Sequence, residues 1–128
     1  MRLPQLVRPR RTELPVQRYL VSFDDGAMDH LGEDELAAAG VESHAVVREA
    51  KAAGVWVFGG GLQRQRAALV GVDGSVTDGP EPGAKAAVGG FAVLEVESRA
   101  DALHWAGRIA AGCRCTQEVR EIMFDPES

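Results

Sequence analysis

The order of strand-forming and helix-forming segments is the feature that most constrains the fold of this chain. Residues 18–23 are rich in β-branched and aromatic residues and stop at Asp24-Asp25-Gly26, a sequence typical of turns. Alanine-rich sequence with apolar residues at helical spacing follows over residues 34–53, and Gly54 stands where a glycine commonly ends a helix. The regular part of the chain is therefore expected to begin with a strand and then a helix.

The middle of the chain predicts a second strand and a hairpin. Residues 55–58 form a short apolar run, which favours a strand. The pair Asp73-Gly74 separates residues 66–72 from residues 75–77, and this pair favours a type I′ turn between two antiparallel strands. Before the hairpin, Gly59-Gly60-Gly61 matches no phosphate-binding fingerprint and is interpreted as a bulge or a close approach of two backbones.

The last third of the chain predicts a long strand, a helix and a closing strand. The strand covers residues 88–97, and Ser98 with Asp101 three residues later resembles the capping box of a helix over residues 99–110. Residues 116–123 form the closing strand. The whole order is strand, helix, strand, hairpin, strand, helix, strand, which is the split βαβ pattern of an α+β, ferredoxin-like fold with an antiparallel sheet.

The two longest apolar strands predict that the protein pairs with a second copy of itself. Residues 55–58 and 91–96 present apolar side chains on both faces of the sheet, yet two helices can cover only one face. The other face would be a large exposed apolar patch. A second sheet from an identical chain is the simplest cover, so we expect a two-fold homodimer with a small-molecule cavity between the sheets.

The segment Val76-Thr77-Asp78-Gly79-Pro80, followed by Gly89-Gly90-Phe91, resembles the signature of the YCII-related family in its DGPF-type branch. The resemblance continues to the closing strand and covers residues 18–123. It implies a ferredoxin-like protein that forms a dimeric α+β barrel. Most members of this family have no assigned reaction, so the resemblance implies more about architecture than about chemistry.

For YCII-related proteins, the resemblance implies a site that pairs a histidine on the first helix with an aspartate before a Gly-Pro turn. Asp78 matches the aspartate, and His44 is the histidine in the first predicted helix, although Ser43 takes the family position if the register differs by one residue. An imidazole held by a carboxylate can act as a general acid or base. The alternatives are that His44 is an ordinary helical residue and that Asp78 only shapes its own turn.

Two functions follow, and the sequence leaves both open. One is a non-catalytic small-molecule-binding or interaction module that uses the dimer cavity, with Trp56, Phe58 and Lys85 as ligand contacts. The other is a small cofactor-free enzyme, such as a lyase or a dehydrochlorinase-like protein, in which Asp78 and possibly His44 transfer protons. Neither function requires a cofactor or a metal, and no metal site is expected.

Several charged residues near the predicted loops are weaker candidates for a site. His30 follows Asp24, Asp25 and Asp29, where a weak metal site is conceivable. Arg64 and Arg66 could hold an anionic ligand, or they could simply lie at the exposed end of the hairpin. His104 on the second predicted helix is expected to be solvated.

The net charge of −5 is unevenly distributed. Four arginines and one glutamate give residues 1–17 a charge of +3, which leaves −8 on the domain of residues 18–128. An acidic domain gains little affinity for nucleic acid from counterion release. The basic segment 1–17 contains prolines without helical or strand periodicity and is expected to be an extended arm. It is interpreted as a disordered leader or a start codon placed too early, or else as an arm that binds an anionic partner or contributes to an interface.

Cys113 and Cys115 are separated by one residue, so on a strand they would lie on one face, with poor geometry for a mutual disulfide. Two cysteines alone also fall short of a zinc site. We interpret them as reduced packing residues, with a redox or metal role as the alternative. No apolar run approaches the length of a membrane span and no signal-peptide core is evident, so a cytoplasmic protein without a membrane partner is expected.

Overall fold

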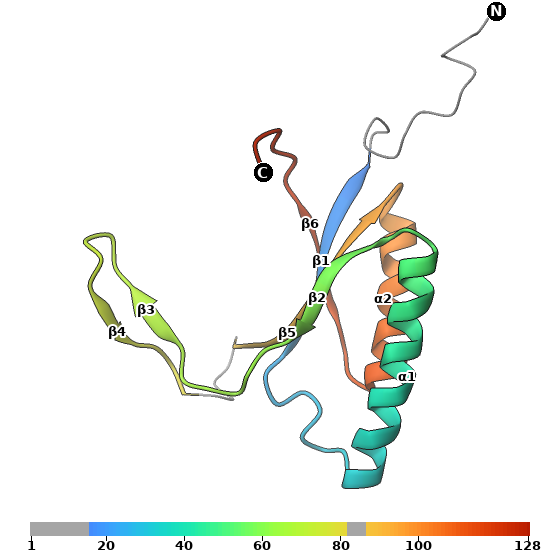
Figure 1. Cartoon of the computed structure of the whole chain (residues 1–128), viewed down its shortest axis with the longest axis horizontal. Coiled ribbons are helices and arrows are strands. Elements are labelled where there is room, and N and C mark those ends of the chain that lie inside the picture. The colour runs from blue at the N-terminus through green and yellow to red at the C-terminus, as the bar shows by residue number, and fades with distance from the viewer. Residues whose placement is uncertain (1–15, 82–86) are drawn as a thin grey trace, which may run out of the picture.

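The computed structural model describes residues 16–81 and 87–128, and it confirms the α+β, ferredoxin-like architecture. A four-stranded antiparallel sheet with the order β2-β5-β1-β6 carries two helices on one face, and a separate two-stranded hairpin, β3-β4, projects from the other side (Figure 1). The elements are β1 (Gln17–Asp24), α1 (Glu33–Ala52), β2 (Trp56–Gly61), β3 (Ala68–Val70), β4 (Val76–Asp78), β5 (Val88–Val96), α2 (Arg99–Cys113) and β6 (Glu118–Ile122).

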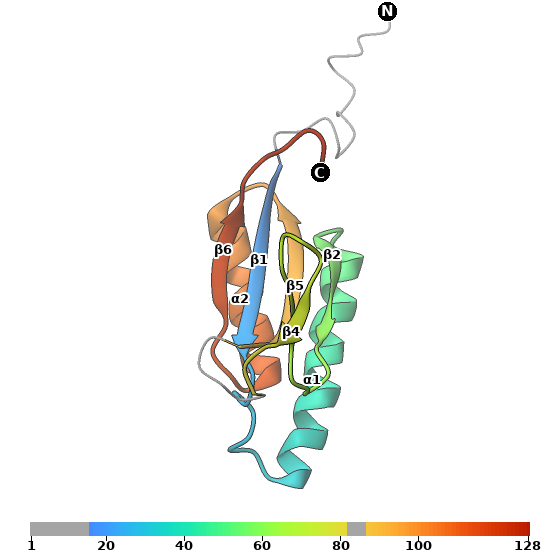
Figure 2. The same ribbon diagram turned by 90° about the vertical axis from the view of Figure 1, so that its left-hand side faces the viewer.

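The core lies between the sheet and the two helices. Side chains alternate along a strand, so Tyr19 and Val21 of β1 point to the same side as Ala92 and Leu94 of β5. Ala106 and other small or branched residues of the helices pack onto them. The turned view shows the sheet lying in front of both helices (Figure 2). The face of the sheet away from the helices is called the open face below.

The chain enters the sheet slightly earlier than expected. β1 begins at Gln17, which pairs with Val96, so the last residue of the predicted arm belongs to the sheet. The hydroxyl of Tyr19 donates a hydrogen bond of 2.7 Å to the Gln17 side-chain oxygen. Val16 is described as irregular backbone before β1, and residues 1–15 of the predicted arm lie outside the described residues.

Helix α1 has the ends that its sequence favours. Three acidic residues occupy its first turn, where they interact favourably with the helix dipole. The Glu35 carboxylate accepts a hydrogen bond of 3.0 Å from the Gly32 N–H. Beyond the last turn, Gly54 adopts φ +75°, a conformation that side chains disfavour, so the prediction of a helix ended by this glycine is confirmed.

Helix α2 begins as predicted and ends later. The Ser98 hydroxyl accepts a hydrogen bond of 3.1 Å from the Asp101 N–H. The helix continues to Cys113 and ends at Arg114, which adopts the left-handed φ of +59° and donates a 2.8 Å hydrogen bond to Glu42 of α1. The expectation that Cys113 and Cys115 share a strand face is therefore wrong, because they flank a helix end. In the described part of the chain, no helix has the length and apolarity needed to cross a membrane.

Strand β2 contains the close backbone approach that its glycines suggested, and a bulge that lies before the glycines rather than at them. The register shifts between Trp56, which pairs with Leu94, and Phe58, which pairs with Val93. A Cβ atom on Gly59 would lie 2.5 Å from the Phe91 carbonyl oxygen, so glycine is required there.

The turn of the hairpin differs from the predicted type I′ turn. A type I′ turn needs positive φ at both Asp73 and Gly74, but only Gly74 has it, at +85°. The Gly71 carbonyl accepts from the Gly74 N–H, and the Gly71 N–H donates to the Ser75 carbonyl, so the loop has three residues and a glycine bulge. The Asp73 carboxylate accepts from the Ser75 N–H at 2.9 Å, which stabilises this alternative. The hydrogen bond from the Ser75 side chain and, second to it, the bond from the Ser75 backbone lower the pKa of Asp73.

Candidate functional site

The open face carries exposed apolar side chains beside charged ones such as the ion pair of Arg18 and Glu95, and no other described element covers it. Phe58 of β2 is 63% exposed there, and its ring centroid lies 5.7 Å from that of Phe91 on β5. Leu20 and Val93 lie between them and β6, where Ile122 is also exposed. Rings and branched side chains of this kind are typical of binding surfaces rather than of solvated sheet faces.

The two aromatic residues predicted as ligand contacts lie on opposite faces. Trp56 packs against the core beneath the helices, whereas Phe58 lies on the open face. Two residues separated by one position normally share a face, and the bulge between them breaks this rule. Within one chain, only Phe58 of this pair can contact a ligand on the open face.

A pocket of about 670 Å³ lies at the end of the open face, where β1 runs into the following loop. Ser22, Asp24, His30, Thr116 and Glu118 are among its lining residues. Ser22 is only 7% exposed, and its hydroxyl forms no hydrogen bond with any residue in the described ranges. A buried hydroxyl without a partner costs free energy, so a hydrogen-bonding group of a ligand would be favoured there.

Ser22 was not among the site residues predicted from the sequence. The sequence did contain a hint of a polar site, because Ser22 interrupts the apolar residues Leu20, Val21 and Phe23 of a predicted strand. Only the register of the sheet, which places it between Phe91 and Glu118 on the open face, distinguishes it from an ordinary exposed serine.

Asp78 lies at the end of β4, exposed, at the base of the hairpin. The turn that follows it is fixed by backbone and arginine contacts. The Gly79 N–H donates to the Ala67 carbonyl at 2.6 Å, and Arg66 donates to the Gly79 carbonyl at 3.4 Å. Arg66 also forms an ion pair with Glu81, so this arginine stabilises the turn and is not free to bind the anionic ligand suggested by the sequence.

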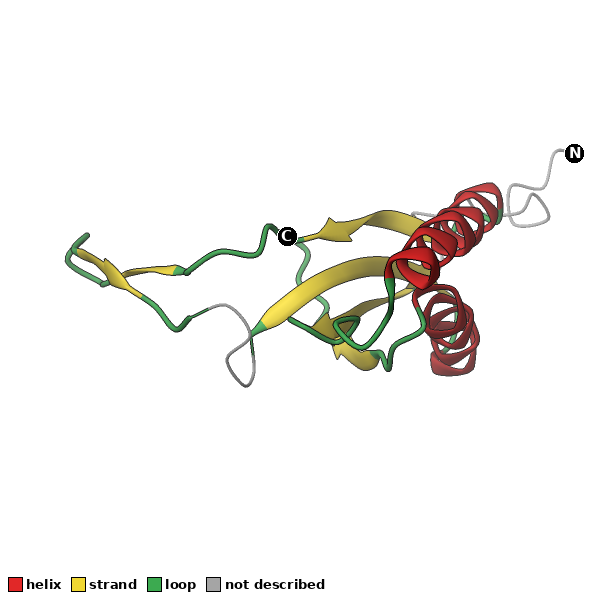
Figure 3. Cartoon of the chain, turned by 90° about the horizontal axis from the view of Figure 1, so that it is seen from below, coloured by secondary structure: helices red, strands yellow, loops and turns green. Residues whose placement is uncertain are grey.

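His44 is exposed on α1, on the opposite side of the sheet from the hairpin (Figure 3). Within the described residues, neither His44 nor Asp78 has a side-chain hydrogen bond or ion pair. One chain therefore does not bring the predicted acid/base pair together. Lys85, the third predicted ligand contact, lies outside the described residues.

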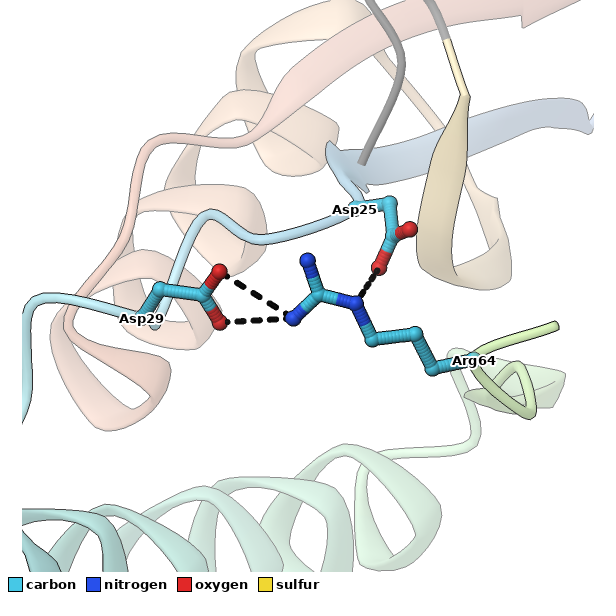
Figure 4. A network of polar contacts seen from close by, with 3 residues as sticks. All are labelled: Asp25, Asp29 and Arg64. Carbon is cyan, nitrogen blue, oxygen red and sulfur yellow. Dashed lines mark hydrogen bonds and ion pairs between the residues drawn. The ribbon is translucent and has the colours of Figure 1, made fainter. Parts of the chain in front are cut away.

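Arg64 joins two acidic residues that the sequence suggested for a metal site (Figure 4). Its Nη1 atom lies 3.0 Å and 3.1 Å from the two carboxylate oxygens of Asp29, and its Nε atom lies 3.8 Å from an Asp25 oxygen. The hydrogen bond and charge of Asp29, with a smaller contribution from Asp25, raise the pKa of Arg64. The arginine thus offsets one of the two negative charges and is not free to bind an anionic ligand. In residues 16–81 and 87–128, no three His, Cys, Asp or Glu side chains are grouped so that they could hold a metal ion.

Both cysteines are free thiols at the far end of α2. Burial is the main cause that raises the pKa of Cys113, and it raises the pKa of Cys115 as well. A raised pKa reduces the thiolate fraction, so both side chains are poor nucleophiles near neutral pH.

The family comparison agrees with this architecture. A search of curated proteins found no match to the chain. The family model of the YCII-related domain matches residues 20–124, which include all six strands and both helices except the first residues of β1. The chain therefore belongs to the YCII-related family.

Proposed function

We propose that the protein is a homodimeric, non-catalytic small-molecule-binding module of the DGPF-type branch, with its ligand held between the open faces of two copies. The observation that carries the proposal is the exposed aromatic pair Phe58 and Phe91 on a sheet face without a covering layer. The motif Asp78-Gly79-Pro80 supports the branch, and the two free thiols support a cytoplasmic location.

The energetics favour covering this face. Burial of one phenylalanine side chain stabilises an assembly by roughly 2–3 kcal/mol. In a two-fold dimer this burial free energy is gained twice, because each residue of the face is present in both copies. At the end of the same face, Ser22 has a hydroxyl without a partner among the described residues, and the pocket around it also contains the charged side chains of Asp24 and Glu118, so it offers polar contacts beside the apolar ones of Phe58 and Phe91.

The catalytic alternative has less support. It requires His44 and Asp78 to approach within hydrogen-bond distance, and the two residues lie on opposite sides of the sheet in one chain. We therefore infer that Asp78 either stabilises its turn or faces a ligand, and that His44 is a solvated residue of α1.

Sedimentation analysis at micromolar concentration tests the dimer. We expect a species of twice the 13.6 kDa chain mass for the wild type and a monomer for Phe58→Lys, because an unpaired buried charge is costly. Val41→Lys is the matched control, since Val41 is 70% exposed on α1, away from the open face. A wild-type monomer would contradict the proposal, as would equal effects of both substitutions.

A ligand screen by nuclear magnetic resonance tests the binding function. With a library of small aromatic fragments that carry hydrogen-bonding groups, we expect shifts at Phe58, Phe91 and Ser22. Ser22→Ala should weaken a fragment that reaches this pocket, by about 1 kcal/mol for one hydrogen bond. Shifts confined to the outer surface of the helices would place the site elsewhere.

A further inference from the structure

The β3-β4 hairpin is a second apolar surface that no other described element covers. It pairs only with itself and contacts none of the other described strands or helices. Leu69, Val70, Val72 and Val76 are all exposed on it. An isolated two-stranded hairpin is marginally stable in water, so this segment gains from being packed against another surface.

The register of the hairpin shows which residues such a surface would meet. Val70 lies directly opposite Val76, and the next pair on the same face is Ala68 with Asp78. Val70 and Val76 are 69% and 66% exposed. One face of the hairpin therefore combines an apolar valine pair with the carboxylate of the family motif.

The base of the hairpin is tied to the loop after β1 by one arginine and is closed by contacts of its own residues. Arg64, in the segment that leads into β3, is bound by Asp25 and Asp29 of the loop after β1 (Figure 4). At the other end, Gly79 is bound by Ala67 and Arg66, which directly precede β3, so these contacts join the two strands of the hairpin to each other. The hairpin projects away from the sheet on the side opposite the helices (Figures 1 and 3).

We propose that this hairpin is an exchanged arm: in the dimer, the Val70 and Val76 face of each copy packs on the open face of the other copy and brings Asp78 to that copy's cavity. The inference rests on the proposed dimer and adds which element makes the contact. The occupant is a second copy because the arm and the open face are both uncovered, belong to one chain and do not meet within it. A single two-fold axis covers both surfaces in both copies.

The arm makes the ligand site composite. Phe58, Phe91 and Ser22 come from one copy, and Asp78 comes from the arm of the other copy. A single chain then holds an incomplete site, which accounts for a motif carboxylate that is exposed and has no partner among the described residues of its own chain.

The dimer dissociation constant measured by sedimentation tests the arm. Val70→Asp and Val76→Asp should each raise this constant at least about tenfold, because each buries a charge in an apolar contact. Val41→Asp, at a valine that is 70% exposed on α1, should change it less than about twofold. Far-ultraviolet circular dichroism should be unchanged, since the hairpin contacts no other element. A monomeric wild type overturns the proposed dimer itself, whereas a dimer unaffected by both hairpin variants overturns only the arm.

Photo-cross-linking gives a readout that does not depend on a destabilising charge. Benzoylphenylalanine placed at position 70 in a mixture of ¹⁴N- and ¹⁵N-labelled chains should form mixed-isotope cross-links to Leu20, Phe58 or Phe91. Cross-links that form only within one chain, or only to helix residues of the second chain, would overturn the exchange. The two results distinguish an arm on the open face from an arm in any other position.

Discussion

At the scale of single residues, glycine has a packing role in β2 that no other residue can take. A Cβ atom on Gly59 would lie 2.5 Å from the Phe91 carbonyl oxygen and 2.7 Å from the Ala92 Cα atom. Both neighbours are backbone atoms of the central strand β5, which cannot rotate away as a side chain could. The close contact between β2 and β5 therefore depends on the absence of a side chain at this position.

We expect Gly59→Ala to lower the free energy of unfolding by about 1–3 kcal/mol, the usual cost of overpacking. Urea denaturation followed by circular dichroism measures this change in the free energy of unfolding. Gly40→Ala is the control, because nothing lies within 4 Å of a Cβ atom there and alanine favours the helix by about 0.5–1 kcal/mol. A variant at position 59 as stable as the wild type would mean that β2 can move away from β5.

At the scale of elements, local signals predicted the helices well and the strand details poorly. The caps at Ser98 and Gly54 act within a few residues, so the sequence contains all the information that they need. The faces of Trp56 and Phe58 depend on a bulge against β5, which no pattern within β2 reveals. The hairpin loop likewise has three residues, with positive φ at Gly74 but not at Asp73, a choice that the pair Asp73-Gly74 does not reveal by itself.

The N-cap of α2 offers a test at this scale. Ser98→Ala removes the acceptor for the Asp101 N–H and should cost about 1 kcal/mol of stability, measured by thermal or urea unfolding. Ser98→Asp, which keeps an acceptor in place, should recover most of the loss. If alanine and aspartate behave alike, the bond contributes nothing to the stability of the helix.

At the scale of the whole molecule, the sequence predicted a two-layer fold and one sheet face in need of a cover. The sequence suggested an anion site at Arg64 and, separately, a metal site at Asp25 and Asp29. In the structure, these three residues form one network of ion pairs. The error has a physical origin: Arg64 and Asp29 are 35 positions apart, and only the folded sheet brings them into contact.

The ion pairs of Arg64 with Asp25 and Asp29 should reduce local opening of the hairpin segment. We expect Arg64→Met to increase amide hydrogen exchange in residues 62–80 while leaving β1 and β5 protected, because exposed ion pairs add little to global stability. Arg48→Met on α1 is the control, since Arg48 has no ion pair with any described residue. Unchanged exchange at residues 62–80 would show that the contacts of Arg64 do not stabilise this segment.

The bulge in β2 has a consequence for solubility during folding. β2 and β6 are the two edges of the main sheet, and an unprotected edge invites pairing with a foreign strand. At the β2 edge, the register shift at Val57 interrupts the ladder, and the following glycines present no side chains to interlock with an incoming strand. At the β6 edge, Glu118, Arg120 and Glu121 place charge along the strand. Both edges are thus poor templates for aggregation, because strands of other molecules cannot readily pair with β2 or β6 and extend the sheet.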